Sequence, residues 1–307
     1  MSCVRLKKCS KMHKIYVHNI ITVFFVLFFF SNDLLVAKQE SVIYKKIGKD
    51  SLYIYFFYPR QTRNSGLPAV VFFHGGAWTK GEPKQFFPQC KTLVKFGIVC
   101  ASVEYRTKLK FGTDPKKSVE DAVSAISYIY DHAEKLNIDP NKIALGGGSA
   151  GGHLAFIAAL MSMKNEKFKP SALILFNPIL NTGPTGFGGK RFGYNWKKYS
   201  PLHNLQPGLP PTLVLSGEKD KIVKSKDLSK LFKFYKEKNI LLKILIYRNK
   251  EHGFFNRSKC CKDMTIGNVI DFLKEIKFIN CKRKFLIKKD CYRTCRVKMV
   301  IKTNFKR

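Results

Sequence analysis

Acidic residues are scarce in this 307-residue sequence, where 21 Asp and Glu stand against 56 Lys and Arg, a formal net charge of +35. Such a basic excess is common in proteins that bind nucleic acids. The sequence has, however, no zinc-finger spacing, no RNP-like aromatic motif and no Gly-Lys-Ser loop. We therefore expect no specific nucleic-acid partner, and only a nonspecific attraction to anionic polymers or surfaces.

Metal-ligand patterns are also absent, although the chain has nine cysteines. Their spacings match no zinc-finger template, so we expect no metal site. Cys100 lies in an apolar run and is expected to be a buried free thiol. The cysteines near the C-terminus can pair in an oxidising compartment, with a connectivity that the sequence leaves open. These are Cys260, Cys261, Cys281, Cys291 and Cys295.

The long apolar run near the N-terminus covers residues 15–30 and follows a lysine-rich stretch. This layout is typical of a secretory signal peptide, with a cleavage site before Lys38. The run is short for a membrane span, which needs about 20 residues. We expect residues 1–37 to be a signal peptide, which makes the protein secreted or periplasmic. An uncleaved N-terminal anchor, with membrane association, is the alternative.

Apolar runs alternate with amphipathic stretches between residues 67 and 278. Runs that are apolar throughout and separated by helical patterns predict a parallel sheet covered on both faces. Residues 41–58 alternate in polarity and predict an antiparallel hairpin at the edge of this sheet. The periodicity fades after Phe278. We therefore expect one α/β domain over 38–278, and a basic, cysteine-containing tail outside the fold over 279–307.

The strongest local signal is a G-x-S-x-G motif formed by Gly147, Ser149 and Gly151. It lies between a predicted strand and a predicted helix, which is the setting that a nucleophilic serine needs. Glycines at the flanking positions avoid collisions in this sharp turn. A phosphate-binding turn is the alternative, but the motif lacks the lysine of a P-loop. Ser149 is therefore the candidate nucleophile.

A second glycine loop, HGGAW at 74–78, follows an earlier predicted strand. Acyl transfer develops an oxyanion, which preorganised N–H groups stabilise, and glycines let the backbone approach it closely. We expect an oxyanion hole made by the N–H groups of Gly75, Gly76 and Ala150. A plain tight turn is the alternative interpretation of the loop.

A serine nucleophile needs a base, and the base needs an acid to orient it. His252 follows the last expected strand of the domain and is the candidate base. Asp220 follows the strand before it and is the candidate acid, with Glu218 as its local rival. The order Ser149, Asp220, His252 is that of the α/β-hydrolases.

These motifs resemble the acetyl esterase and lipase branch of the α/β-hydrolases, which is related to hormone-sensitive-lipase-like enzymes. The resemblance implies an α/β-hydrolase fold with a mostly parallel, eight-stranded sheet flanked by helices, and no cofactor. Many members have Asp where this chain has Gly148, and others read HGGG where it has Ala77. Neither change removes a triad residue or a backbone donor. The matching stretches are HGGAW at 74–78, SVEYRT at 102–107, DPNKIALGGGSAGGHLA at 139–155, PPTLVLSGEKDKIV at 210–223 and EHGFF at 251–255.

The activity expected from these motifs is hydrolysis of short-acyl, acetyl-type esters through an acyl-enzyme on Ser149. Small-molecule or carbohydrate esters are the expected substrates, and the oligomeric state is left open. A serine peptidase of the same fold and a noncatalytic binding protein with a hydrolase fold are the alternatives. Aromatic residues in the segment 177–208, which we expect to cover the site, suggest a platform for a sugar or aryl group, although simple packing explains them as well. They are Phe187, Phe192, Tyr194 and Trp196.

Overall fold

The computed structural model describes residues 38–60, 66–164 and 168–303. The expected signal peptide or anchor over 1–37 lies outside these ranges. Within them, no helix combines the length and the apolar character needed to cross a membrane.

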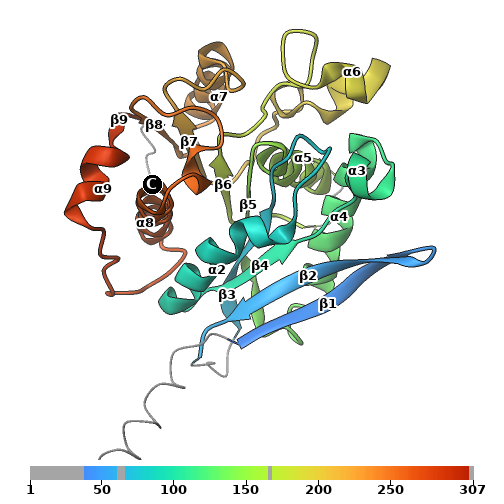
Figure 1. Ribbon diagram of the computed structural model, residues 1–307, viewed down its shortest axis with the longest axis horizontal. Coiled ribbons are helices and arrows are strands. Elements are labelled where there is room, and N and C mark those ends of the chain that lie inside the picture. The colour runs from blue at the N-terminus through green and yellow to red at the C-terminus, as the bar shows by residue number, and fades with distance from the viewer. Residues whose placement is uncertain (1–37, 61–65, 165–167, 304–307) are drawn as a thin grey trace, which may run out of the picture. The chain divides into compact units, whose positions relative to one another are not determined.

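Nine strands form one sheet in the order β1-β2-β4-β3-β5-β6-β7-β8-β9. Strands β3 to β8 run parallel to their neighbours in the set, while β1, β2 and β9 pair antiparallel. The expected edge hairpin is confirmed as β1–β2 (Figure 1). The strands are β1 (Lys38–Ile47), β2 (Asp50–Tyr58), β3 (Leu67–Phe73), β4 (Val99–Val103), β5 (Ile138–Gly148), β6 (Ala172–Phe176), β7 (Thr212–Gly217), β8 (Leu242–Tyr247) and β9 (Val297–Lys302).

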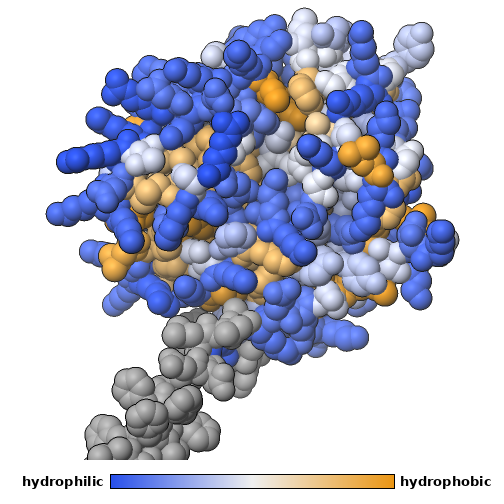
Figure 2. Space-filling view, viewed as in Figure 1, coloured by the Kyte–Doolittle hydropathy of each residue, from blue (hydrophilic) through white to orange (hydrophobic). Residues whose placement is uncertain are grey.

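Helices cover both faces of the sheet, as expected for strands that are apolar throughout. α4 and α5 pack together on one face, and α2 and α8 pack together on the other (Figure 1). The face seen in Figure 2 is mainly hydrophilic, with small scattered apolar patches. The helices are α2 (Phe87–Leu93), α3 (Lys108–Phe111), α4 (Pro115–Asp131), α5 (Ala150–Lys164), α6 (Gly189–Phe192), α7 (Ser225–Glu237), α8 (Lys259–Glu275) and α9 (Lys289–Thr294).

The two helices next to the nucleophile strand, α4 and α5, are stabilised in different ways. α4 begins at Pro115, and the Asp114 side chain caps it by accepting hydrogen bonds from Lys116 N and Lys117 N. Its apolar side faces the sheet, and its other side is polar. α5 is rich in alanine and is buried along almost its whole length. It therefore forms a rigid, central support behind Ser149.

The C-terminal segment is part of the fold, which corrects the expected tail at 279–307. β9 pairs antiparallel with β8 and adds a ninth strand to the eight that the family resemblance implies. A disulfide joins Cys260 of α8 to Cys291 of α9. Most side chains of β9 are exposed, so the strand has no apolar periodicity in the sequence.

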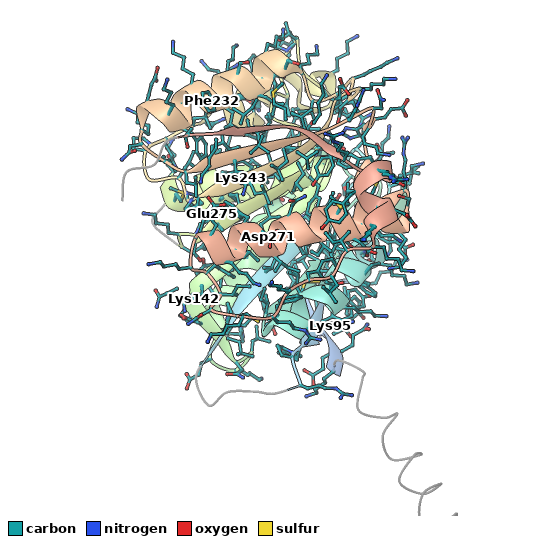
Figure 3. All side chains as sticks on the ribbon, turned by 90° about the vertical axis from the view of Figure 1, so that its left-hand side faces the viewer. Lys95, Lys142, Phe232, Lys243, Asp271 and Glu275 are labelled. Atoms are coloured by element: carbon teal, nitrogen blue, oxygen red, sulfur yellow. A yellow bond between two sulfur atoms is a disulfide. The ribbon has the colours of Figure 1, made fainter. Side chains whose placement is uncertain are left out.

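Ion pairs fasten the same segment to the sheet. Glu275 of α8 accepts a hydrogen bond from Lys243 of β8 at 2.8 Å, and Figure 3 shows these two side chains together. Lys302 of β9 reaches Glu275 at 2.5 Å. The three charged residues link α8, β8 and β9 at one edge of the sheet.

The expectation that Cys100 is a free thiol is wrong. Cys100 of β4 forms a disulfide with Cys90 of α2, and their Cα atoms are 5.1 Å apart. α2 packs directly on β4, which brings the two buried side chains together. The sequence shows both cysteines, but not that the inner face of α2 lies over β4.

Candidate active site

Ser149 lies in a sharp turn between β5 and α5, with a positive φ of 55°. Its N–H donates to Phe176 O at 2.9 Å, which fixes the turn against β6. A Cβ at Gly147 would lie 2.4 Å from Gly151 C, and one at Gly151 would lie 1.9 Å from Phe73 O. The flanking glycines are therefore required, and the predicted strand-turn-helix setting of Ser149 is confirmed.

His252 bridges Ser149 and Asp220. Its Nε2 lies 2.7 Å from Ser149 Oγ, and its Nδ1 lies 3.0 Å and 2.9 Å from the two carboxylate oxygens of Asp220. A hydrogen bond from Nδ1–H to the carboxylate leaves Nε2 as the acceptor that faces the serine hydroxyl. The arrangement can take a proton from Ser149 and hold the resulting positive charge next to Asp220.

The sheet brings these three residues together although they are far apart in the sequence. Ser149 follows β5, Asp220 follows β7 and His252 follows β8, so all three lie at the carboxyl ends of parallel strands. The Asp220 side chain is fully buried. Its Oδ1 also accepts hydrogen bonds from Ile222 N and Val223 N, which holds the carboxylate toward the histidine.

Glu218, the rival acid, points elsewhere. It accepts a hydrogen bond from Asn249 N at 2.8 Å and pairs with Lys298 of β9. The hydrogen bond from Lys298 is the main reason why the pKa of Glu218 is lowered from its ordinary value. The carboxylate that contacts His252 is that of Asp220.

The glycine loop at 74–78 lies next to Ser149, but one of its expected donors is occupied. Gly75 N–H donates to Gln85 Oε1 at 2.6 Å, so it is not available to an oxyanion in this structure. Gly76 has a φ of 124°, and a Cβ there would lie 1.9 Å from Lys80 O. Within the described ranges, Gly76 N–H donates to no backbone acceptor. Ala150 N–H is the first amide of α5, which a helix leaves without an internal acceptor.

His74 fixes the backbone of this loop through the contacts of its ring and its carbonyl oxygen. Its ring stacks on Tyr105 at 4.1 Å, and Tyr105 donates its hydroxyl proton to His74 O. The His74 ring also bonds Gly75 O through Nδ1. Burial lowers the pKa of His74 to about 4. His74 is therefore neutral near pH 7 and orders the loop backbone.

The segment over 177–208 packs against the same loop. Arg191 donates to Ala77 O at 2.5 Å and to Thr79 Oγ1 at 3.3 Å. Phe192 is fully buried, with its ring 5.3 Å from that of Trp78. Phe192 thus packs in the interior and offers no surface to a sugar or aryl group.

The other three aromatic residues of this segment differ in exposure. Tyr194 is fully exposed, whereas Trp196 is half-buried and packs edge-on against His203. Phe187 is half-buried beside Trp78, with the Arg191 guanidinium over its ring. Of the four aromatic residues, Tyr194 is therefore exposed, and Phe187 and Trp196 are partly exposed.

Two residues of the site carry no recognisable motif in the sequence. Gln85 holds Gly75, and Asn177 lies with its Nδ2 atom 3.4 Å from His252 Nε2. Asn177 directly follows the apolar strand β6, just as Asp220 follows β7 closely. A polar residue at a strand end was therefore an available signal for Asn177, while nothing in the sequence distinguishes Gln85.

Comparisons with known proteins identify similar esterases. A family model described as BD-FAE matches residues 54–178. Esterase 2 from Thermogutta terrifontis has 32% sequence identity and a TM-score of 0.74 over 80% of this chain and 97% of its own. Esterase LipQ from Mycobacterium tuberculosis is 27% identical over 62% of this chain and 50% of its own length. The chain thus spans about half the length of that curated relative, and less of others.

The chain belongs to the esterase and lipase family of the α/β-hydrolases. It has the fold of that family, with a mostly parallel sheet flanked by helices.

One departure from the esterase motif has a structural counterpart. Where many members have Asp, a Cβ at Gly148 would lie 2.5 Å from Phe255 Cζ. The Phe255 ring packs against Phe176 at 4.8 Å and Phe86 at 5.6 Å. An aromatic cluster thus fills the space into which a side chain at position 148 would extend.

Proposed function

We propose that this protein is a serine carboxylesterase that hydrolyses short-acyl esters. The observation that carries the proposal is the position of His252 between Ser149 Oγ and the Asp220 carboxylate. Binding alone does not require a buried carboxylate, an oriented imidazole and a strained serine that are joined by hydrogen bonds.

The proposed reaction has two steps. In the first, Ser149 Oγ attacks the ester carbonyl while His252 Nε2 takes its proton, and the alcohol leaves with that proton. In the second, water attacks the acyl-enzyme, gives a proton to Nε2, and the acid leaves as Ser149 recovers its hydroxyl proton. Asp220 stabilises the imidazolium in both steps. The N–H groups of Gly76 and Ala150 are the proposed oxyanion donors.

A short acyl group is supported by the relatives and by the aromatic cluster. The Thermogutta terrifontis esterase has been solved with butyrate and with propionate bound. In this chain, Phe86 and Phe255 crowd the space beside Gly148. Acetyl esters, including those carried on carbohydrates, fit the proposal. Comparing turnover of acetylated xylan, p-nitrophenyl acetate and a triglyceride emulsion tests the alcohol and acyl preference.

Export from the cytoplasm is part of the proposal. The expected cleavage site lies immediately before Lys38, where β1 begins. The disulfides Cys90–Cys100 and Cys260–Cys291 are consistent with an oxidising compartment. Sequencing the N-terminus of the protein recovered from the extracellular or periplasmic fraction tests this; an intact Met1 in a membrane fraction would favour the anchor instead.

Replacing the nucleophile is the direct test of the activity. We expect Ser149→Ala to abolish turnover of p-nitrophenyl acetate and labelling by a fluorophosphonate, because the proposed acyl-enzyme forms on the Ser149 hydroxyl. The urea midpoint of the variant should match that of the wild type within measurement error. Activity retained by a folded Ser149→Ala protein would refute the proposal, and a panel of ester and peptide substrates separates an esterase from a peptidase.

A further inference from the structure

Asn177 occupies an unusual position at the end of β6. This strand lies between β5, which leads to Ser149, and β7, which leads to Asp220. The residue is fully buried and has a φ of 37°, a conformation that costs a non-glycine residue free energy. Its N–H donates to Leu215 O at 2.6 Å. The fold therefore fixes the Asn177 side chain between the strand that leads to Ser149 and the strand that leads to Asp220.

The amide of Asn177 contacts the base on the side of its reacting nitrogen. Asn177 Nδ2 lies 3.4 Å from His252 Nε2, the same nitrogen that lies 2.7 Å from Ser149 Oγ. Asn177 Oδ1 has no hydrogen-bond partner within the described part of the chain, although it is buried. An unpaired buried amide oxygen costs about 1–3 kcal/mol. An apolar residue at this position would avoid that cost, so the amide oxygen is a candidate acceptor for a hydrogen bond from a molecule bound in the site.

Ser216, at the end of the neighbouring strand β7, provides a comparison. Its hydroxyl oxygen is also buried and without a hydrogen-bond partner among the described residues. No hydrogen bond joins Ser216 to Ser149, Asp220 or His252 within those residues. In the described part of the chain, Asn177 and Ser216 thus both carry an unpaired polar atom near a strand end, and of these two it is Asn177 that contacts the catalytic histidine.

We propose that Asn177 positions the water that hydrolyses the acyl-enzyme; this rests on the proposed esterase activity. Once Ser149 Oγ is acylated, it has no proton to donate to His252 Nε2. A water molecule takes that place, donating one hydrogen to Nε2 and the other to Asn177 Oδ1. Its oxygen attacks the acyl carbon as Nε2 takes its proton. The tetrahedral intermediate then collapses, Ser149 Oγ receives the proton from Nε2, and the carboxylic acid leaves.

This role predicts a defect in one half of the reaction. Acylation uses the serine hydroxyl, which His252 already contacts, so Asn177→Ala should change the acylation rate less than about threefold. Deacylation should slow by about 10- to 100-fold, the equivalent of one or two lost hydrogen bonds. The kcat and KM for p-nitrophenyl acetate should then fall together, with a burst of p-nitrophenol and an acyl-enzyme visible by intact-protein mass spectrometry.

The experiment is pre-steady-state kinetics on the full chain, with rates expressed per site titrated by a fluorophosphonate. This normalisation removes any effect of a misfolded fraction, because only competent sites are counted. Asn177→Asp, which keeps an acceptor oxygen, should recover part of the deacylation rate. Ser216→Ala is the matched control and should leave the ratio of the two rates unchanged.

Two results overturn the inference. One is an equal fall of acylation and deacylation in Asn177→Ala, which would indicate a general disturbance of the site. The other is an unchanged deacylation rate. Failure of the esterase proposal itself would appear differently, as an absence of labelling and turnover in the wild type.

Discussion

Gln85 shows how a single side chain can set the geometry of a backbone donor. Its Oε1 accepts the Gly75 N–H at 2.6 Å, and the next amide in the chain is that of Gly76, the proposed oxyanion donor. Gly75 itself is buried, so loss of the acceptor would leave its N–H unpaired. The side chain thus acts on the oxyanion hole through the loop and needs no contact with the substrate.

We expect Gln85→Ala to lower kcat/KM for p-nitrophenyl acetate by about 10- to 100-fold, because the loop can rotate to satisfy the freed Gly75 N–H. Gln85→Glu keeps an acceptor oxygen and should retain most of the activity. Steady-state kinetics of the two variants checks this pair. Similar activity in Gln85→Ala and the wild type would mean that other contacts of the loop are sufficient.

For single residues, the sequence predicts a functional role where the residue lies in a motif. It does not predict the role of a residue that acts through one contact in the folded chain. Ser149 is flanked by required glycines, and His252 and Asp220 follow apolar strands, so each has a signal. Gln85 lies in the short 3-10 helix Pro83–Phe86 just before α2, and its partner becomes apparent only when the backbone is folded. The sequence likewise does not show that the Gly75 N–H donates to Gln85 and so does not face the oxyanion.

At the scale of elements, α5 joins the nucleophile to the segment that packs over the glycine loop. His153 of α5 donates through Nε2 to Tyr199 O at 2.7 Å, and its ring lies edge-on to Trp78 at 5.0 Å. It is fully buried, and its Nδ1 has no partner within the described residues. Burial lowers the pKa of His153 to about 4, which outweighs the opposing effect of the bond to Tyr199. The helix therefore depends on a neutral imidazole at this contact.

This depressed pKa predicts how stability varies with pH. The unfolded chain binds a proton near the ordinary value of 6.5, whereas the folded chain resists it until about pH 4. The stabilisation from burying neutral His153 is complete above pH 6.5. As the pH falls toward 4, this residue lowers the free energy of unfolding by about 3 kcal/mol. His153→Gln keeps a donor for Tyr199 O and does not titrate. Urea unfolding at pH 7 and pH 4.5 should show a smaller loss for the variant, and parallel losses would contradict the prediction.

The elements that the sequence predicted have either a continuous apolar run or a strong apolar period. Strands β3 to β8 and helices α4, α5 and α7 all lie within residues 67–278, where apolar runs alternate with amphipathic stretches in the sequence. β9 was missed because four of its six residues are exposed, so it shows no such period. Its place is decided by the unpaired edge of β8, which is a property of the folded sheet.

At the scale of the whole described domain, the C-terminal segment closes one edge of the sheet beside the catalytic histidine. Arg248 lies just after β8, four residues before His252. Its N–H donates to Arg296 O at 2.9 Å. The Cys260–Cys291 disulfide fixes α9 to α8 and so holds this segment in place. The strand that supports His252 is thereby paired on both sides.

Removing this disulfide should destabilise the domain. The two cysteines are 31 residues apart, and a cross-link of that length stabilises by about 4 kcal/mol through the entropy of the unfolded chain. We expect the double variant Cys260→Ser, Cys291→Ser to lose about that much in urea unfolding, and to lose esterase activity on heating sooner than the wild type. Cys281→Ser is the matched control, because Cys281 is a free thiol on the same segment. Equal stability of the double variant and the control would mean that β9 is held without the disulfide, by its pairing with β8 and by ion pairs such as Lys302–Glu275.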